Sequence, residues 1–377
     1  MNTLLRGATS PICALFASNL AIGLVGCSQA ADSAPSAQQS QGLSFTPPAT
    51  GAVITQTNAV EANELLIYSR ALDGTLAAVG QIATGGTGLG SGLSAQGAIA
   101  HEGHFLFVVN AGSSDISTFD LVTGTPVLVA LTPSNGVEPV SVTAHGPSVY
   151  VLNAEGPGNI AGFLADDSGA LHPVGTLPLS GANVTPTEVD FSPDGRTLIV
   201  TEKGTSLIDV YTVDPSGTAR GPDTQASDGP APFGFAFAPD GEVFVSEAEN
   251  SAASAYATLG ERLLSISASV ANGQSAACWL AASPDGQHIF TANAGNGTLS
   301  SYRVGAWGRL ELVSGVSAAM AATSHPVDMA FAGGGQYLYS LANVAGTITG
   351  FKVDGADLTR VGAVESLPAS VTGLVAW

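Results

Sequence analysis

Basic side chains are scarce in this sequence, which has 10 Lys and Arg against 30 Asp and Glu and a formal net charge of −20. A surface this acidic repels a phosphate backbone, so the composition argues against nucleic-acid binding. The same charge disfavours docking on anionic lipid. We therefore expect membrane contact only through a covalent lipid anchor.

Cysteine is also rare, with Cys13, Cys27 and Cys278 as the complete set. Cys13 and Cys27 belong to the N-terminal region, so Cys278 stands alone in the rest of the chain. A disulfide framework is therefore not expected, and the hydrophobic core has to stabilise the fold.

The N-terminal region has the pattern of an export signal. Residues 12–25 are mostly apolar but too few to cross a bilayer as a helix, which is typical of a signal peptide. They end in Leu-Val-Gly followed by Cys27, which resembles the lipobox of bacterial lipoproteins. The resemblance implies that residues 1–26 are cleaved and that Cys27 is diacylated. An ordinary signal peptide with an incidental Cys27 is the alternative.

Residues 27–50 are rich in Ser, Ala, Gln and Pro, and they contain few bulky side chains. Such a segment buries too little apolar surface to fold, so we predict a flexible tether. The predicted protein is thus exported and lipid-anchored at the cell envelope, as a periplasmic or outer-membrane lipoprotein. Residues 51–377 form the predicted folded domain.

Long amphipathic helices are missing from the pattern, because no segment of more than about ten residues repeats apolar side chains at helical spacing. Short apolar runs bounded by Gly, Pro, Asn and Asp predominate, which favours strands joined by tight turns. Three of the turns share one sequence, in which Pro presets φ, Asp bonds the local backbone and Gly adopts a positive φ. These turns are Pro193-Asp194-Gly195, Pro239-Asp240-Gly241 and Pro284-Asp285-Gly286.

One short pattern occurs seven times, 43 to 52 residues apart: a small polar residue ends an apolar run, and an aromatic residue follows eight to ten positions later. A period of this length with four short strands per unit is typical of a β-propeller. The pairs are Asn58 and Tyr68, Asn110 and Phe119, Asn153 and Phe163, Thr201 and Tyr211, Ser246 and Tyr256, Asn293 and Tyr302, and Asn343 and Phe351. The sequence therefore predicts an all-β, seven-bladed β-propeller with four-stranded blades.

The two ends of the predicted domain complete one blade together. Residues 367–375 have the pattern of an inner strand with no blade after it, and residues 52–56 have that of a second strand with no inner strand before it. Pairing them closes the ring and removes the exposed sheet edges. Six blades with stray strands is the alternative.

The Pro-led inner strands, the Pro-Asp-Gly turns and the Asn-Ala-Gly segments at 110–112 and 293–295 resemble the lactonase-type seven-bladed propellers. This family includes 6-phosphogluconolactonases and proteins labelled carboxymuconate cyclases. The resemblance implies His and Arg side chains where several inner strands begin to face the channel. Here the matching positions are Ser141, Glu188, Gly234, Trp279 and Asp328, and His325 lies one place ahead of the expected site.

Glu188 and Asp328 are the candidate catalytic residues, because a channel carboxylate could act as general base toward water. We expect them nearly across the ring from each other, with pKa values raised by desolvation and mutual repulsion. Their alternative role is structural, as solvated acids or acceptors for backbone N–H groups. Ser141, Phe233, Trp279 and His325 are the candidate ligand-binding residues of the channel.

No cofactor is predicted. The sequence has no compact Asp-x-Asp-x-Asp-Gly loop, so no metal site is assigned. A divalent cation such as calcium is the alternative, with carboxylates from Glu188, Asp190, Glu247, Glu249 and Asp328. The glycine-rich residues 84–92 do not match a phosphate-binding loop, and we interpret them as a loop over the channel mouth.

Two functions follow from these observations. The first is a monomeric propeller that binds a small molecule or a protein at the channel mouth and lacks the family's His and Arg set. The second is a lactone hydrolase, similar to 6-phosphogluconolactonase, in which a channel carboxylate activates water. A water-filled pocket beside Glu188 would favour the enzyme, whereas a channel filled by Phe233, Trp279 and Val327 would favour the binding protein.

Overall fold

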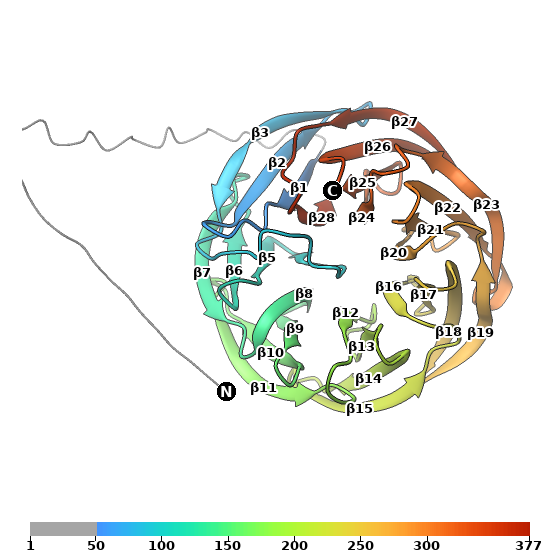
Figure 1. Cartoon of the computed structure of the whole chain (residues 1–377). Coiled ribbons are helices and arrows are strands. Elements are labelled where there is room, and N and C mark those ends of the chain that lie inside the picture. Colours follow the sequence, from blue (N-terminus) through green and yellow to red (C-terminus); the bar gives the residue numbers. More distant parts are fainter. Residues whose placement is uncertain (1–50) are drawn as a thin grey trace, which may run out of the picture. The chain divides into compact units, whose positions relative to one another are not determined.

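The computed structural model describes residues 51–377, which form seven four-stranded antiparallel sheets arranged as the blades of a ring (Figure 1). The predicted all-β, seven-bladed propeller is confirmed. The predicted signal peptide, Cys27 and the tether lie outside the described residues. Within residues 51–377 the one helical element is a 3₁₀ turn, Ala306–Gly308. Nothing helical in this range has the length and apolar character needed to cross a bilayer.

The blades are named A to G, and their strands are given from the channel outward. Blade A contains β28 (Thr372–Ala376), β1 (Ala52–Gln56), β2 (Glu64–Arg70) and β3 (Leu76–Ala83). Blade B contains β4 (Ile99–Glu102), β5 (Phe105–Asn110), β6 (Asp115–Asp120) and β7 (Val127–Pro133). Blade C contains β8 (Val137–His145), β9 (Ser148–Glu155), β10 (Asn159–Ala165) and β11 (Leu171–Pro178). Blade D contains β12 (Pro186–Phe191), β13 (Thr197–Glu202), β14 (Leu207–Val213) and β15 (Ala219–Ala226).

The remaining blades follow the same order. Blade E contains β16 (Pro232–Phe237), β17 (Val243–Glu247), β18 (Ala252–Leu259) and β19 (Arg262–Ala271). Blade F contains β20 (Ala277–Ala282), β21 (His288–Asn293), β22 (Thr298–Val304) and β23 (Leu310–Ala319). Blade G contains β24 (Pro326–Ala332), β25 (Tyr337–Ala342), β26 (Thr347–Asp354) and β27 (Asp357–Val364).

Blade A closes the ring by joining the two ends of the domain. Strand β28 pairs antiparallel with β1, with Ile54 opposite Val375. Beyond the ladder, the Trp377 N–H donates to the Ala52 carbonyl at 3.0 Å. The predicted closure is confirmed: β28 becomes the inner strand of blade A, and β1 gains a hydrogen-bonded neighbour on each side.

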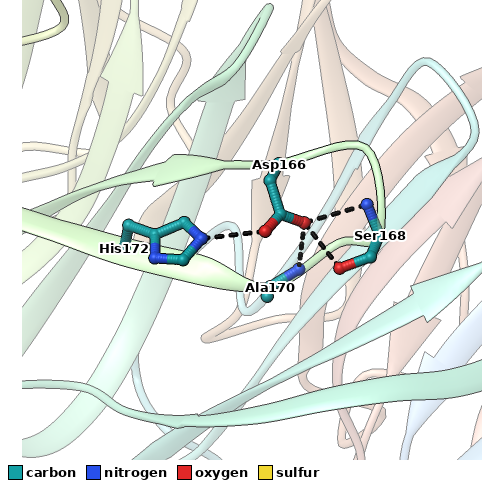
Figure 2. A network of polar contacts seen from close by, with 4 residues as sticks. All are labelled: Asp166, Ser168, Ala170 and His172. Atoms are coloured by element: carbon teal, nitrogen blue, oxygen red, sulfur yellow. Dashed lines mark hydrogen bonds and ion pairs between the residues drawn. The ribbon is translucent and has the colours of Figure 1, made fainter.

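The turns use the chemistry that the sequence predicts. In blade D, the Asp194 carboxylate accepts from Ser192 Oγ at 2.7 Å and from the Arg196 N–H at 3.1 Å, and Gly195 has φ of 69°. A related turn joins β10 to β11, where the Asp166 carboxylate accepts from the Ser168 N–H at 2.8 Å (Figure 2). These short-range bonds hold the hairpins without help from the core.

The seven repeated aromatic residues all lie on the third strand of their blades, and six of them are buried. The repeated polar position differs in part from the prediction. Asn110 pairs with Asp115 and Asn293 with Thr298 across the β-hairpin, and the residues with the same register in blades D and E are Glu202 and Glu247. Thr201 and Ser246 therefore lie one place before this register position, and Asn343 lies one place after it, since Ala342 pairs with Thr347 in blade G.

In blades B and D this polar position fastens the blade to the segment arriving from the preceding blade. Asn110 Oδ1 accepts from Thr84 Oγ1 at 2.7 Å, and Glu202 Oε2 accepts from Ser180 Oγ at 2.5 Å. Asn and Glu both present a side-chain oxygen at the same place, which explains why either residue type fulfils the role.

Candidate functional site

The inner strands surround a central channel with two different mouths. We call the mouth at which these strands begin the N-terminal mouth, and the mouth at which they end the C-terminal mouth. The two mouths differ in what fills them, so each is described in turn.

Aromatic side chains fill the N-terminal half of the channel. Phe233 and Trp279 are 1% and 3% exposed, and their ring centroids lie 4.7 Å apart. Val327 belongs to the same buried apolar cluster. These large side chains occupy the N-terminal half of the channel. A channel filled in this way is the outcome expected for a binding protein.

The connection between β3 and β4 completes the closure by reaching toward the middle of the ring (Figure 1). The Gln96 amide donates to the carbonyls of Phe235 at 3.2 Å and Leu280 at 2.9 Å, and it accepts from the Leu280 N–H at 3.0 Å. The Trp279 indole N–H donates to the Ala95 carbonyl at 3.1 Å. A segment from between blades A and B thus plugs the channel against blades E and F.

A glycine allows this segment to lie close to the blades. A Cβ on Gly88 would come within 2.1 Å of the Asn58 carbonyl carbon, which no side chain can tolerate. The glycine-rich residues 84–92 therefore serve close packing at the N-terminal mouth, and they lead into the plug instead of a phosphate site.

The C-terminal half of the channel contains a cavity of about 370 Å³. Its walls come from the inner strands of blades A, B, C, D and G. The polar side chains that line this cavity are those of Glu188 and Asp190 on β12, Thr143 on β8, and His101 on β4. His101 is exposed and lies at the rim of the cavity. The structure thus combines a plugged half with an open pocket beside Glu188.

Glu188 lies at the inner end of this cavity and is 4% exposed. Its Oε2 accepts from the Phe235 N–H at 2.6 Å. Burial raises the pKa of Glu188 well above its ordinary value, and the charges of Asp190 and Asp328 act in the same direction. A carboxyl group in this setting retains a proton that it can donate or exchange.

Asp190 lies two residues further along β12 and faces the same cavity. Its Oδ1 accepts from Thr143 Oγ1 at 2.6 Å and from the Phe191 N–H at 2.8 Å. Burial raises the pKa of Asp190, although these two donors oppose the shift. Strand alternation places residues i and i+2 on one face, so this second carboxyl was readable from the sequence as a neighbour of Glu188.

Asp328 is on the opposite part of the ring, on β24, and is 4% exposed. Its Oδ1 accepts from the Met329 N–H at 2.8 Å. Burial raises the pKa of Asp328 to about 8. Asp328 is outside the residues that line the cavity, and it influences Glu188 through its charge.

Ser141 and His325 have local partners. Ser141 is fully buried, and its Oγ accepts from the Val189 N–H at 3.2 Å. His325 Nδ1 lies 3.1 Å from Asn343 Oδ1, and its ring is edge-on to Trp279 with centroids 6.3 Å apart. The predicted ligand-binding residues Phe233, Trp279 and His325 are thus together at the N-terminal mouth, separate from the cavity at the other end.

A cation and a thiol lie near the aromatic pair. Lys203 Nζ is 5.4 Å from the centroid of the Phe233 ring, a cation–π distance that the sequence analysis did not anticipate. Burial raises the pKa of the Cys278 thiol to about 12. Cys278 is therefore a thiol at neutral pH and has the character of a small core residue.

The carboxylates that offered an alternative calcium site are dispersed in the fold. Glu247 Oε1 accepts from Ser254 Oγ on the neighbouring strand β18, away from the cavity. Among residues 51–377, no group of three or more His, Cys, Asp and Glu side chains is arranged to hold a metal ion.

Sequence reasoning missed Gln96 and His101 at the channel. Gln96 is in an irregular segment far in sequence from its partners on β16 and β20, and no local pattern marks it. His101 lies near the end of the inner strand β4, and the assignment of that strand would have placed it at the C-terminal mouth.

Comparison with known proteins agrees with this architecture. The profile of the family described as "Lactonase, 7-bladed beta-propeller" matches residues 141–262 and 269–376. A search among proteins of curated function finds no matching sequence.

Solved structures share the fold over most of the chain. The periplasmic gluconolactonase PpgL of Pseudomonas aeruginosa is 19% identical, with a TM-score of 0.69 over 86% of this chain and 98% of that chain. A protein from Lactobacillus plantarum is 17% identical, with a TM-score of 0.71 over 87% and 99%. A Bacteroides uniformis protein provisionally assigned as a 6-phosphogluconolactonase is 19% identical, with a TM-score of 0.69 over 86% and 99%.

Proposed function

Because this chain belongs to the lactonase family of seven-bladed β-propellers, we propose that it uses the family scaffold to bind a small, uncharged, hydroxyl-bearing ligand without hydrolysing it. The ligand occupies the cavity at the C-terminal mouth of the channel. The lipobox-like sequence before Cys27 supports a location outside the cytoplasm, with a lipid on Cys27 as the proposed membrane anchor.

One observation carries the proposal: the cavity presents the carboxyl groups of Glu188 and Asp190, and its lining residues include neither Lys nor Arg. A carboxyl group held partly protonated both donates to and accepts from a hydroxyl group. A phosphate or carboxylate entering the cavity would meet like charge without a compensating cation. The cavity chemistry therefore selects neutral hydroxylated ligands over phosphosugars.

The plugged N-terminal mouth supports binding over turnover. The family resemblance implies His and Arg where the inner strands begin to face the channel, and these positions hold Trp279 and the buried acids Glu188 and Asp328. A positioned cation or N–H pair would normally stabilise the oxyanion formed when water attacks a lactone carbonyl. The cavity-lining side chains offer no permanent cation for that purpose.

The raised pKa of Glu188 favours a second candidate, hydrolysis of an uncharged lactone. In that reaction Glu188 in its ionised form accepts a proton from water while the water oxygen bonds to the lactone carbonyl carbon. The ring C–O bond then breaks, and the proton passes from Glu188 to the departing alkoxide. The products are a carboxylic acid and a free hydroxyl group.

Calorimetric binding and a lactone hydrolysis assay separate the two candidates. The probes are D-glucono-1,5-lactone, its 6-phospho form and methyl β-D-glucoside, tested at mildly acidic pH where spontaneous lactone opening is slow. We expect the two uncharged probes to bind, the phosphorylated one not to bind, and the lactone to open at its spontaneous rate.

Two variants connect any signal to the cavity. Asp190→Asn and Glu188→Gln keep the side-chain shape, and each should weaken binding about tenfold, as expected for one lost hydrogen bond to a buried carboxyl group. Asp357→Asn is the matched control, since Asp357 is exposed and outside the cavity lining. Turnover that disappears in Glu188→Gln would replace the binding proposal with the hydrolase. Tight binding of the phosphorylated lactone would contradict both the site and its ligand class.

A further inference from the structure

A second cavity of about 370 Å³ opens next to the first, between blades A and B. Its walls are mainly apolar and include Ile54, Leu121, Val122, Pro126 and Trp377. Val122 lies on the turn between β6 and β7 and is 70% exposed, although a side chain of this kind is normally buried. The second cavity therefore offers an apolar surface that the proposed ligand-binding function does not use.

His101 connects the two cavities because it lines both of them. Its ring stacks on Trp377, with centroids 4.7 Å apart and an interplanar angle of 30°. The chain crosses the same boundary at the end of blade A, where Ala376 lines the channel cavity and Trp377 lines the second one. The two cavities are thus adjacent compartments on either side of one stacked pair.

The compartments differ in chemistry. The channel cavity contains the carboxyl groups of Glu188 and Asp190, whereas the second cavity contains the indole of Trp377 and the aliphatic side chains of Leu121 and Val122. A ligand that fills both would need a hydrogen-bonding head and an apolar tail, joined at His101. Hydroxyl groups satisfy the buried acids, and burial of the tail supplies the hydrophobic contribution.

We infer that the two cavities form one bipartite site for an uncharged amphiphile, whose hydroxylated head lies beside Glu188 and Asp190 and whose alkyl or aryl tail lies against Trp377 and Val122. This inference rests on the proposed function, which assigns the head group. It adds the tail, and with it the ligand class: glycosides or related hydroxylated compounds with an apolar substituent.

Two probes that differ only in the tail test the inference. Methyl and hexyl β-D-glucoside are titrated into purified protein carrying Cys27→Ser, which avoids the detergent that an acylated chain would need. We expect the hexyl compound to bind about tenfold more tightly, because roughly two of its additional methylenes become buried. Binding of the methyl compound alone reports on the head-group site.

Val122→Asp puts a charge into the tail compartment from an exposed turn, so the fold should tolerate it. It should reduce the advantage of the hexyl compound to less than about twofold and leave methyl glucoside binding unchanged. Leu259→Asp is the matched control, because Leu259 is 64% exposed at the β18–β19 turn of blade E. Trp377→Ala removes the stack on His101 and should have the same effect as Val122→Asp.

The outcomes separate the two proposals. Equal affinity for methyl and hexyl glucoside, or a hexyl advantage that survives Val122→Asp, would overturn the bipartite site and leave the head-group proposal standing. If neither glucoside nor the uncharged lactone binds, the proposed function and the inference both fail.

Discussion

The buried carboxyl groups of Glu202 and Asp209 share one backbone donor in blade D. The Ser180 N–H donates to Glu202 Oε1 at 3.0 Å and to Asp209 Oδ2 at 2.9 Å. In blades B, E and F the residue with the register of Asp209 is a serine: Ser117, Ser254 or Ser300. Blade D therefore places a second acid where other blades have a neutral hydroxyl group.

Asp209→Asn should remove a pH-dependent loss of stability. Burial, together with Glu202, raises the pKa of Asp209 from 3.8 to about 7. The folded state then holds a proton that the unfolded state has released, so stability falls as the pH rises from about 4 to 7. The unfolding free energy should therefore differ less between pH 5 and pH 8 in the variant, by on the order of 2 kcal/mol. Urea denaturation at the two pH values measures this difference.

The turn acid Asp166 provides the contrasting control (Figure 2). Hydrogen bonds from Ser168 and His172 lower the pKa of Asp166, so its contribution is present above its unfolded pKa and is lost on acidification. Asp166→Asn should therefore change stability in the opposite pH direction. If Asp209→Asn leaves the pH dependence unaltered, the two carboxyl groups of blade D are not sharing a proton.

Asp328→Asn should stabilise the protein at alkaline pH. Burial raises the pKa of Asp328 to about 8, so ionisation of the folded protein is costly and stability falls between about pH 4 and pH 8. Asparagine retains the oxygen that accepts from the Met329 N–H. Thermal denaturation at pH 9 should show a gain on the order of 2 kcal/mol. The exposed Asp357 in the same blade supplies the control variant Asp357→Asn, for which no gain is expected.

Gln96→Ala should loosen the plug at the N-terminal mouth. The variant leaves the Phe235 and Leu280 carbonyls and the Leu280 N–H without their side-chain partner. We expect a loss of about 2–4 kcal/mol in unfolding free energy and faster limited proteolysis within residues 84–95. Gln81→Ala changes an exposed glutamine of β3 and serves as control. Unchanged proteolysis in Gln96→Ala would show that other contacts hold the segment.

Cys278 should react slowly with thiol reagents in the folded protein. Burial raises its pKa to about 12, which leaves almost no thiolate at neutral pH, and its side chain is buried on β20, the strand that Gln96 holds through Leu280. Colour development with a disulfide reagent, in a Cys13→Ser and Cys27→Ser background, should be slow until denaturant is added. Gln96→Ala should accelerate it several-fold. Fast labelling of the unmodified fold would mean that the N-terminal mouth is open.

Local patterns were sufficient to predict the fold, because strands and hairpin turns depend on neighbouring residues. The Pro-Asp-Gly turns and the seven aromatic positions established the repeat, and the incomplete strands at the two ends predicted the blade A closure. The register error at Thr201 and Ser246 also arises because the repeat was inferred from neighbouring residues alone. Each of them is a small polar residue beside the acid that actually fastens the blade, and only the cross-strand pairing separates the two.

The site was predictable only in part. The family resemblance placed Glu188 at a channel-facing position, and Asp190 follows from it by strand alternation. The plug was not predictable, because Gln96 bonds to carbonyls of β16 and β20 that are more than a hundred residues away. Which mouth stays open depends on these long-range contacts.

The sequence by itself thus determined the seven-bladed scaffold, its closure and the acidic channel positions, since periodicity and turn chemistry act over a few residues. The tertiary structure alone decided that aromatic residues and Gln96 close one mouth and that Glu188 and Asp190 face a cavity at the other. It also decided that His101 stacks on Trp377 between two cavities. The physical reason is that a cavity is the space left by side chains from several blades, and no single segment of sequence specifies that space.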